Sequence, residues 1–248
     1  GRTNAQFGLI KENDRIMIGF SGGKDSLTLL HTLNRMQKKA PFKFDFKAVT
    51  ITYGMGEQIE FLSNHCKEHG IEHEIIDTQI FDLAGEKIRK NSSFCSFFSR
   101  MRRGYLYTTA LEQGYNKVAL GHHLDDAMES YFMNLFYNGT MRTMPPIYKA
   151  SNGLEVIRPL IFCRERQLRA FADSNEIRVI GDEACPGLRF DVKMPHARAA
   201  TKELLAKLEE QNPKIFVSMK AAFSNIQLPT FFYKDLKDIK LNIEDENI

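Results

Sequence analysis

Short apolar runs alternate with segments of helical periodicity along most of the chain. The apolar runs have the length of buried strands, and they lie at residues 15–20, 46–52, 72–79, 117–122 and 154–161. Apolar residues at helical spacing follow the runs, as at residues 25–39, 57–70 and 124–139. This alternation predicts an α/β fold in which about five strands form a doubly wound parallel sheet.

The pattern changes after about residue 180, where helical periodicity continues without further strands. Two helices are predicted there, over residues 196–211 and 213–226, and we expect them to pack on the sheet domain. Residues 227–248 mix both charge signs with few large apolar side chains, which is typical of a loosely ordered tail. We therefore expect one domain over residues 1–226, with a helical C-terminal part from about residue 180, and a tail over residues 227–248.

The composition is that of an ordinary globular protein, with 248 residues, 43% hydrophobic, 26% charged and a net charge of +3. No apolar run approaches the roughly 18 residues of a membrane span, and the first residues show no secretory signal. Four cysteines lie far apart and form no CxxC pair, and we expect Cys66 and Cys163 to be core residues. These features predict a cytoplasmic protein with reduced thiols and no membrane contact.

Positive charge is concentrated in two stretches of the chain. Residues 87–103 contain six lysines and arginines and no acidic residue, and residues 189–207 are also mainly basic. Such patches suit a phosphate-rich partner. Solvated helix faces are the alternative interpretation for each stretch taken alone.

The sequence SGGKDS directly follows the first predicted strand and begins the first predicted helix. Two glycines let backbone N–H groups close around an anion, and the helix N-terminus adds a partial positive charge. The aspartate suits a helix cap or a group near a magnesium-bound pyrophosphate. The spacing differs from the GxxxxGK[ST] loop of ordinary NTPases, and a plain strand-to-helix turn is the alternative. We expect the ATP phosphates to be bound by Ser21, Gly22, Gly23, Lys24, Asp25 and Ser26.

A second motif, GHHLDDAMES, follows the fourth predicted strand and therefore lies at the same edge of the sheet. Asp125 and Asp126 are paired carboxylates, the hard oxygen ligands that suit the magnesium accompanying ATP. Gly121, His122 and His123 are candidate ATP contacts, because the imidazoles could hydrogen-bond phosphate or reacting groups. A helix start with acidic residues in its first turn is the alternative interpretation.

The motif SGGxDS after a first strand resembles the ATP pyrophosphatase (PP-loop) superfamily, whose members split ATP between its α and β phosphates and adenylate an oxygen. The stretches CSFFSRMRRGYLYTTA, GHHLDDAMESYFMNLFYNGTMRTMPP and VIRPLIFCRERQL resemble the tRNA 2-thiocytidine synthetase family, and the match continues to about residue 226. Lysidine synthetases share SGGxDS and HHxDD but carry a distinct C-terminal extension. The short basic helices of this chain fit the thiolation branch better.

The resemblance implies an enzyme that uses ATP and magnesium to adenylate the 2-oxo group of a cytidine in the tRNA anticodon loop. A sulfur nucleophile then displaces AMP, with sulfide or a persulfide-carrying protein as the sulfur donor. Relatives make a homodimer plausible. The resemblance assigns Asp125 and Asp126 to ATP–magnesium binding and makes Arg103 and Arg158 candidate ATP contacts. The candidate tRNA contacts are Arg100, Arg102, Arg142, Lys193 and Arg198, for each of which an ordinary surface role is the alternative.

The sulfur site departs from the family pattern. Members of that family present CxxC at the position of Cys95 and a cysteine pair near Cys185, and they bind an iron–sulfur cluster. Here Phe98 and Asp182 stand where further cysteines are expected, and two thiolates are fewer than the three or four usual for a cluster. Three hypotheses stay open. Cys95 and Cys185 form a catalytic sulfur-transfer pair, or an iron–sulfur cluster binds with Asp182 or His196 as a further ligand. In the third, both thiols are buried small hydrophobic side chains.

Two other functions fit the same motifs. The first is another ATP-dependent activation, such as amination or lysine attachment, which would survive replacement of Cys95 and Cys185 by serine. The second is an adenine-nucleotide-binding module without turnover, whose sulfur site has decayed. Release of pyrophosphate on mixing with ATP, magnesium and tRNA would exclude the second.

Overall fold

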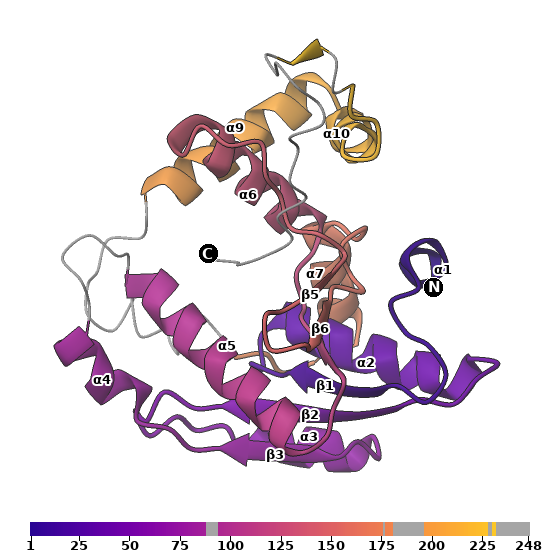
Figure 1. The fold of residues 1–248 in the computed structure, drawn as a ribbon, viewed down its shortest axis with the longest axis vertical. Helices are drawn as coiled ribbons and strands as arrows, with labels where there is room; N and C mark the ends of the chain where they lie inside the picture. Colours follow the sequence, from indigo (N-terminus) through magenta and orange to yellow (C-terminus); the bar gives the residue numbers. More distant parts are fainter. Residues whose placement is uncertain (88–93, 176, 181–195, 228–229, 232–248) are drawn as a thin grey trace.

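The computed structural model describes residues 1–87, 94–175, 177–180, 196–227 and 230–231, with the backbone alone for 84–87, 94–96 and 196. One six-stranded sheet runs through the protein in the order β3-β2-β1-β4-β6-β5 (Figure 1). Its strands are β1 (Arg15–Gly19), β2 (Asp45–Ile51), β3 (His73–Ile76), β4 (Lys117–Ala119), β5 (Ile147–Lys149) and β6 (Glu155–Ile157). All neighbouring strands are parallel except β5 and β6. The predicted α/β fold class is confirmed.

Helices connect the parallel strands, as the alternating pattern predicts. Those before β4 are α1 (Arg2–Phe7), α2 (Lys24–Lys39), α3 (Glu60–Glu68), α4 (Ile80–Lys87) and α5 (Phe94–Glu112). Those after β4 are α6 (Leu124–Tyr137), α7 (Glu165–Ser174), α9 (His196–Gln211) and α10 (Ile215–Ala222). The hydrophobic pattern assigned neither α4 nor α5, which share a stretch rich in basic and aromatic residues.

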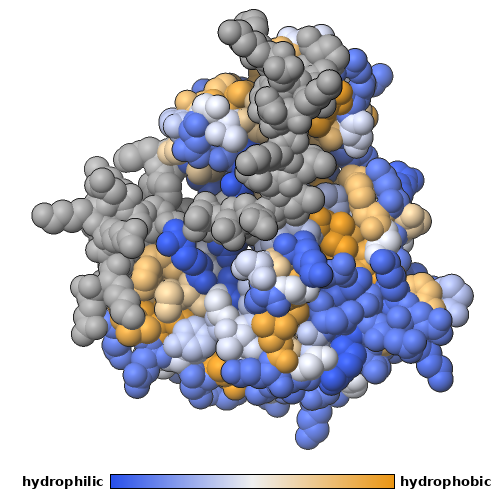
Figure 2. Space-filling view, in the orientation of Figure 1, coloured by the Kyte–Doolittle hydropathy of each residue, from blue (hydrophilic) through white to orange (hydrophobic). Residues whose placement is uncertain are grey.

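Successive side chains of a strand point to opposite faces of the sheet. Helices cover both faces, so the side chains of both faces are buried. In β1, Ile16 and Ile18 join the core formed with α2 and α3, which includes Leu29 and Leu62. Met17, between them, joins the opposite core formed with α5. On the face drawn in Figure 2, apolar side chains form separate small groups among hydrophilic ones. No helix in the described ranges is long and apolar enough to cross a membrane.

The edge strand β5 differs from the prediction of a purely parallel sheet of about five strands. It runs antiparallel to β6, with Ile147 opposite Ile157, and the pair is joined by a tight connection over residues 150–154. Within that connection the backbone N–H of Ala150 donates to the carbonyl of Leu154 at 2.8 Å. Strands β4 and β6 are equally short but lie in longer apolar runs, whereas two prolines precede β5 and a lysine ends it, so the sequence pattern does not reveal it.

The C-terminal helices pack on α6 through a small apolar cluster of their own. Leu124 and Met128 of α6 contact Leu205 of α9 and Phe216 of α10 in this cluster. Figure 1 shows α9 alongside α6, at the opposite end of the molecule from α3 and β3. The helical C-terminal segment is therefore present as predicted. The domain limits stay predictions, and most of the predicted tail, residues 232–248, lies outside the described residues.

Candidate active site

The two sequence motifs meet where the strand order of the sheet reverses. The chain runs from β1 outward to β2 and β3 and then returns to β4 on the other side of β1. Strands β1 and β4 are parallel neighbours, with Ile18 opposite Ala119, so residues 21–26 and 121–126 leave the sheet side by side. Ligands of open α/β sheets bind at such a reversal, outside the carboxyl ends of the strands.

Gly121 shows how closely the two motifs approach. A Cβ atom at this position would lie 3.1 Å from the backbone carbon of Asp25 and 3.2 Å from the backbone nitrogen of Ser26. Both of those atoms belong to the first turn of α2, which cannot shift as a flexible side chain can. The absence of a side chain at residue 121 therefore allows the second motif to contact the start of α2.

The loop before α2 leaves the N-terminus of the helix open. Its N-cap is Gly23, which has no side chain to cap the first turn, and the first intrahelical bond runs from Leu27 N–H to the Gly23 carbonyl at 3.0 Å. The hydroxyls of Ser21 and Ser26 lie 3.2 Å apart beside it. The N–H groups of residues 24–26 thus have no partner within the helix, which is the arrangement that binds anions.

A second glycine in the loop is required by both backbone and packing. Gly22 has φ of 79°, in the left-handed region that favours glycine. A Cβ there would lie 2.5 Å from Ile180, whose N–H donates to the Gly22 carbonyl at 2.9 Å. The segment after α7 therefore covers one side of the loop.

Asp25 carries the one buried side-chain oxygen without a hydrogen-bond partner among the described residues. This Oδ1 lies 3.4 Å from Lys24 Nζ and 3.9 Å from His123 Nε2. Burial raises the pKa of Asp25, and Asp126 adds to the rise, while Lys24 and His123 oppose it. A buried carboxylate oxygen that accepts no hydrogen bond in this position is suited to binding a cation.

His123 and Asp126 form a reciprocal cap at the start of α6. The backbone N–H of His123 donates to Asp126 Oδ2 at 3.0 Å, and the backbone N–H of Asp126 donates to His123 Nδ1 at 3.4 Å. Because Nδ1 accepts a hydrogen bond, the proton of the neutral ring is on Nε2, 3.4 Å from Asp126 Oδ2. The imidazole therefore directs its N–H toward the carboxylates of the site.

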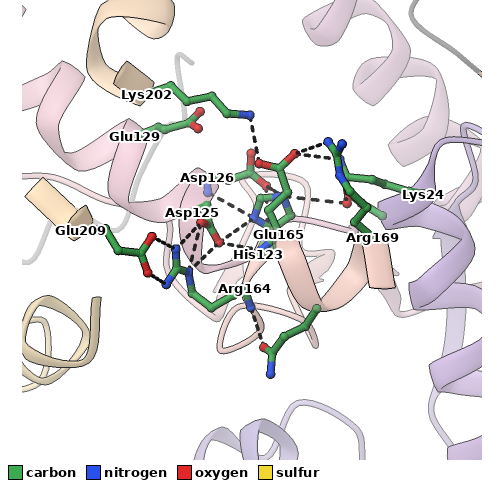
Figure 3. Close-up of polar contacts among 12 residues, drawn as sticks. Lys24, His123, Asp125, Asp126, Glu129, Arg164, Glu165, Arg169, Lys202 and Glu209 are labelled. Atoms are coloured by element: carbon green, nitrogen blue, oxygen red, sulfur yellow. Dashed lines mark hydrogen bonds and ion pairs between the residues drawn. The ribbon is translucent and has the colours of Figure 1, made fainter. Parts of the chain in front are cut away.

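Asp125 is fully engaged within the protein. Its two oxygens accept hydrogen bonds from Arg164 Nε at 3.1 and 3.2 Å, and Oδ2 also accepts from the backbone N–H of Glu165 at 2.7 Å. Arg164 donates its other two nitrogens to Glu209 of α9 at 2.7 and 2.8 Å, and its guanidinium lies 3.4 Å from the centre of the Phe216 ring. Figure 3 shows Arg164 between Asp125 and Glu209. Asp125 thus joins α6 to α7 and, through Arg164, to the C-terminal helices.

Glu165 connects the phosphate loop to two other helices (Figure 3). Its Oε1 lies 3.1 Å from Lys24 Nζ, and its Oε2 lies 2.9 Å from Lys202 Nζ of α9. Burial alone would raise the pKa of Glu165, but the contacts with Lys202 and Lys24 lower it to about 2. Burial would likewise lower the pKa of Lys24, but Asp25 and Glu165 raise it. Both groups are therefore ionised at neutral pH.

Arg198, a predicted tRNA contact, instead binds carboxylates of α6. Its Nε donates to Glu129 Oε2 at 2.8 Å and its Nη2 donates to Asp126 Oδ1 at 2.8 Å. Burial raises the pKa of Glu129 and Arg198 opposes that rise, so the arginine compensates a carboxylate at the interface of α6 and α9. The charge of Arg198 is therefore neutralised by carboxylates of the protein itself, and its contact with tRNA stays a prediction.

The remaining predicted arginines occupy different settings. Arg158 is only 1% exposed, donates to the Pro145 carbonyl at 2.7 Å and to His122 Nδ1 at 3.3 Å. Arg102 donates to the Tyr53 hydroxyl at 2.8 Å and lies over that ring. The Arg158 guanidinium serves the packing of the β4–β6 end of the sheet, so its contact with ATP stays a prediction. Among the other candidates, Arg100 is exposed and Arg103 and Arg142 are half-buried.

The predicted sulfur site is only partly described. Phe98 of α5 is 3% exposed and packs against Tyr53, Phe81 and Phe97, with ring centres 5.4 to 6.4 Å apart. It fills the core between α5 and the sheet and offers no ligand for iron. Cys95 lies on the first turn of α5 with its side chain outside the described atoms. Cys185, Asp182 and Lys193 lie outside the described residues, and so does the side chain of His196.

The other two cysteines are unsuited to sulfur transfer. Cys66 is completely buried in the core of α2 and α3, and burial raises the pKa of its thiol to about 12. Burial also raises the pKa of the half-buried Cys163. Neither thiol ionises readily near neutral pH. Cys66 lies in the core as predicted, whereas Cys163 is half-buried and packs against that core.

Sequence reasoning missed the side chains that join the motifs to the C-terminal helices, namely Glu129, Arg164, Glu165, Lys202 and Glu209. They come from three helices, and no local pattern marks them. The one signal in the sequence is the charged pair Arg164 and Glu165, which directly follows the apolar run at residues 160–163.

Comparisons with known proteins agree with this geometry. The family model of a PP-loop domain matches residues 2–193. A Geobacter metallireducens protein named tRNA-cytidine(32) 2-sulfurtransferase is 44% identical over 230 residues, which cover 92% of this chain and 88% of the relative. A Pseudomonas syringae protein of the same name is 39% identical over 231 residues, covering 92% of this chain and 82% of the relative.

Solved structures show the same fold. The U34-tRNA thiolase NcsA from Methanococcus maripaludis, with its [4Fe-4S] cluster, is similar with a TM-score of 0.74 at 23% identity. That match covers 94% of this chain and 80% of the thiolase. An NH3-dependent NAD synthetase from Campylobacter jejuni is similar with a TM-score of 0.50 at 16% identity, over 83% of this chain and 90% of the synthetase.

Proposed function

The chain belongs to the PP-loop domain family, and from this premise we propose that it is an ATP-dependent enzyme that thiolates a cytidine of tRNA. The observation that carries the proposal is the meeting of the open N-terminus of α2 with the carboxylates of Asp25 and Asp126 at the sheet reversal. The names of relatives 38–44% identical to the chain support the choice of tRNA and of position 2 of cytidine. Such an enzyme works in the cytoplasm, where its substrate is.

The loop over residues 21–26 holds the pyrophosphate of ATP. Free N–H groups of the first turn of α2 and the charged Lys24 are suited to the β and γ phosphates, which leave together. The 2-oxo oxygen of the base attacks the α phosphorus, and the bond from that phosphorus to the bridging oxygen of pyrophosphate breaks. Positive charge at the leaving group stabilises the charge that develops as this bond breaks.

Magnesium fits the site through Asp25 rather than Asp125. Both Asp125 oxygens accept hydrogen bonds from α7, whereas the buried Oδ1 of Asp25 has no hydrogen-bond partner among the described residues. We assign the ion to Oδ1 of Asp25. Asp126 lies beside it and its charge already raises the pKa of Asp25, but both Asp126 oxygens accept hydrogen bonds, from the backbone N–H of His123 and from Arg198. Bound at Asp25, magnesium would supply positive charge against the phosphates. Asp125 acts as a positioning residue, because it fixes the start of α7 and with it Glu165 beside Lys24.

Sulfur transfer through an iron–sulfur cluster does not fit the described residues, since Phe98 fills a ligand position with a core side chain. We propose that Cys95 and Cys185 act as a thiol pair. Cys95 receives the terminal sulfur of a donor protein's persulfide, and that sulfur attacks the adenylated carbon while AMP leaves. Cys185 then attacks the Cys95 sulfur, which frees the thiolated base and forms a disulfide that a dithiol reductant reopens.

The activation step is tested by measuring AMP and pyrophosphate formed from ATP and magnesium, with and without tRNA. We expect tRNA-dependent release in the wild type and a loss of about a hundredfold in Asp25→Asn. Because burial raises the pKa of Asp25 in spite of the nearby Lys24, the ionised carboxylate opposes folding, and Asp25→Asn should be at least as stable as the wild type. Asp45→Asn, at an exposed strand start, is the matched control and should keep full activity. No release from the wild type, or full activity in Asp25→Asn, would contradict the proposal.

A further inference from the structure

Three of the seven histidines lie together on the face of the sheet covered by α2 and α3. His31 is on α2, His65 is on α3, and His69 directly follows α3. We call these residues the histidine cluster. One nitrogen of each ring lies within 4.8 Å of the corresponding nitrogen of the other two, and within the described ranges no other three histidine, cysteine or acidic side chains meet in this way.

The spacing within the histidine cluster suits a shared metal ion. His31 Nε2 and His65 Nε2 are 2.9 Å apart, and the three ring centres are 4.5 to 5.0 Å apart. A tetrahedral zinc ion with Zn–N bonds of about 2.0–2.1 Å separates two ligand nitrogens by about 3.3 Å. The two Nε2 atoms share a hydrogen bond, so one of them carries a proton. Once that proton moves to Nδ1 of the same ring, a shift of a few tenths of an ångström would let both Nε2 atoms bind one ion.

The ring of His69 is already oriented to bind the same ion. His69 Nδ1 lies 2.9 Å from the backbone carbonyl of His65, which can only accept, so the ring donates from Nδ1 and its Nε2 lone pair is free. A hydrogen bond of this kind fixes the tautomer of metal-binding histidines in proteins. Burial lowers the pKa of His31 to about 4 and also lowers that of His65, which favours the neutral form of imidazole that binds metals.

The histidine cluster is separate from the ATP site and open on one side. His31 lies seven residues after Lys24 on α2, about 10 Å along the helix axis. His69 is exposed, and His31 also lines a cavity of about 660 Å³ together with Arg35 and Phe171. An ion held here would have access to water for a fourth ligand.

We propose that the histidine cluster binds one divalent transition-metal ion of the zinc class, with three imidazole ligands and water in the fourth position. The ion joins α2, which begins at the phosphate loop, to α3 on the same face of the sheet. Neutral imidazoles are good ligands for zinc, and three of them with one open position form a common zinc geometry.

The proposal is tested on full-length protein stripped of metal with a chelator. Zinc affinity is measured by competition with a chromophoric chelator, and cobalt replaces zinc to reveal a tetrahedral site by its visible absorption. We expect one zinc equivalent that depends on the histidines, and a rise in Tm of roughly 5–10 °C at free zinc a hundredfold above Kd. In His69→Gln the affinity should fall more than about a hundredfold, since even a partner behind a ligand is worth about 10–100-fold.

Two further variants control the measurement. His31→Gln should lose the same equivalent, and His73→Gln should keep it, because His73 instead contacts Thr50 Oγ1 at 2.9 Å and Ser63 Oγ at 3.0 Å. Zinc on thiols would be common to all variants and cancels in the comparison, and circular dichroism checks that each variant is folded. Equal zinc affinity in wild type and His69→Gln, or no zinc bound by folded wild type, would overturn the proposal.

Discussion

Glu165 joins three helices through one carboxylate, and replacing it tests whether this bridge holds the site together. Glu165 is the first residue of α7, and its carboxylate contacts Lys24 of the phosphate loop and Lys202 of α9. Glu165→Gln keeps the shape of the side chain and removes its charge. We expect the variant to be less stable at neutral pH because Lys202 loses its carboxylate partner and Lys24 keeps only Asp25 among the described residues.

The size of the effect follows from the pKa of Glu165, which is about 2 against an ordinary value of 4.5. A pKa below the ordinary value means that the ionised carboxylate stabilises the fold above about pH 4.5, and that this stabilisation is lost as the pH falls toward 2. The gap, at about 1.4 kcal/mol per pH unit, gives at most about 3.5 kcal/mol. For a chain of this length that corresponds to a fall in Tm of at most roughly 7–14 °C.

The assay is urea unfolding followed by circular dichroism, for wild type and Glu165→Gln, at pH 7 and at several lower pH values. The difference in free energy of unfolding should be largest at pH 7 and shrink steadily below pH 4.5. Glu203→Gln is the matched control, since Glu203 is exposed on α9 and pairs with Lys207 at 2.7 Å, and it should change little. Equal stability of wild type and Glu165→Gln at pH 7, or a difference that ignores pH, would refute the reasoning.

Two further substitutions test the joints of the site. Gly121→Ala should lower the free energy of unfolding by about 1–3 kcal/mol and slow pyrophosphate release at least tenfold, because its Cβ would lie 3.1 Å from the backbone of α2. Gly104→Ala, with open space around residue 104, is the control and should keep full activity. Arg164→Met should cost about 1.5–3 kcal/mol, because Asp125 loses its guanidinium partner and Glu209 keeps only Arg166, at 3.5 Å, of the residues that the structure describes. Hydrogen exchange should show residues 196–222 opening first. Unchanged activity in the first variant, or unchanged exchange in the second, would contradict these assignments.

The sequence reveals the fold and the place of the site because both follow from patterns continuous along the chain. Apolar runs mark β1 and β4, and each motif directly follows its strand, so the rule for strand ends brings them to one edge. Strand β5 stays hidden because, unlike β4 and β6, it is not part of a longer apolar run: two prolines precede it and Lys149 ends it. Its antiparallel pairing with β6 appears only in the folded structure.

Which carboxylate has an oxygen available for a metal ion could not be predicted from sequence. Asp125 and Asp126 look like the metal ligands in the motif, yet the oxygens of both accept hydrogen bonds from other residues, whereas Oδ1 of Asp25 accepts none from the described residues. Whether an oxygen is free depends on partners from distant segments of the chain. The same applies to Arg198, whose positive charge suggested RNA but which neutralises carboxylates of α6.

The most direct test of the proposed function is the nucleoside composition of tRNA incubated with the chain, ATP, magnesium, a persulfide donor and a dithiol reductant. Mass spectrometry of the digested tRNA should show 2-thiocytidine with the wild type. With Cys95→Ser it should show none, although tRNA-dependent release of pyrophosphate continues. Pyrophosphate release by the wild type without any 2-thiocytidine, or with a base carrying an amine or lysine instead, would contradict the account.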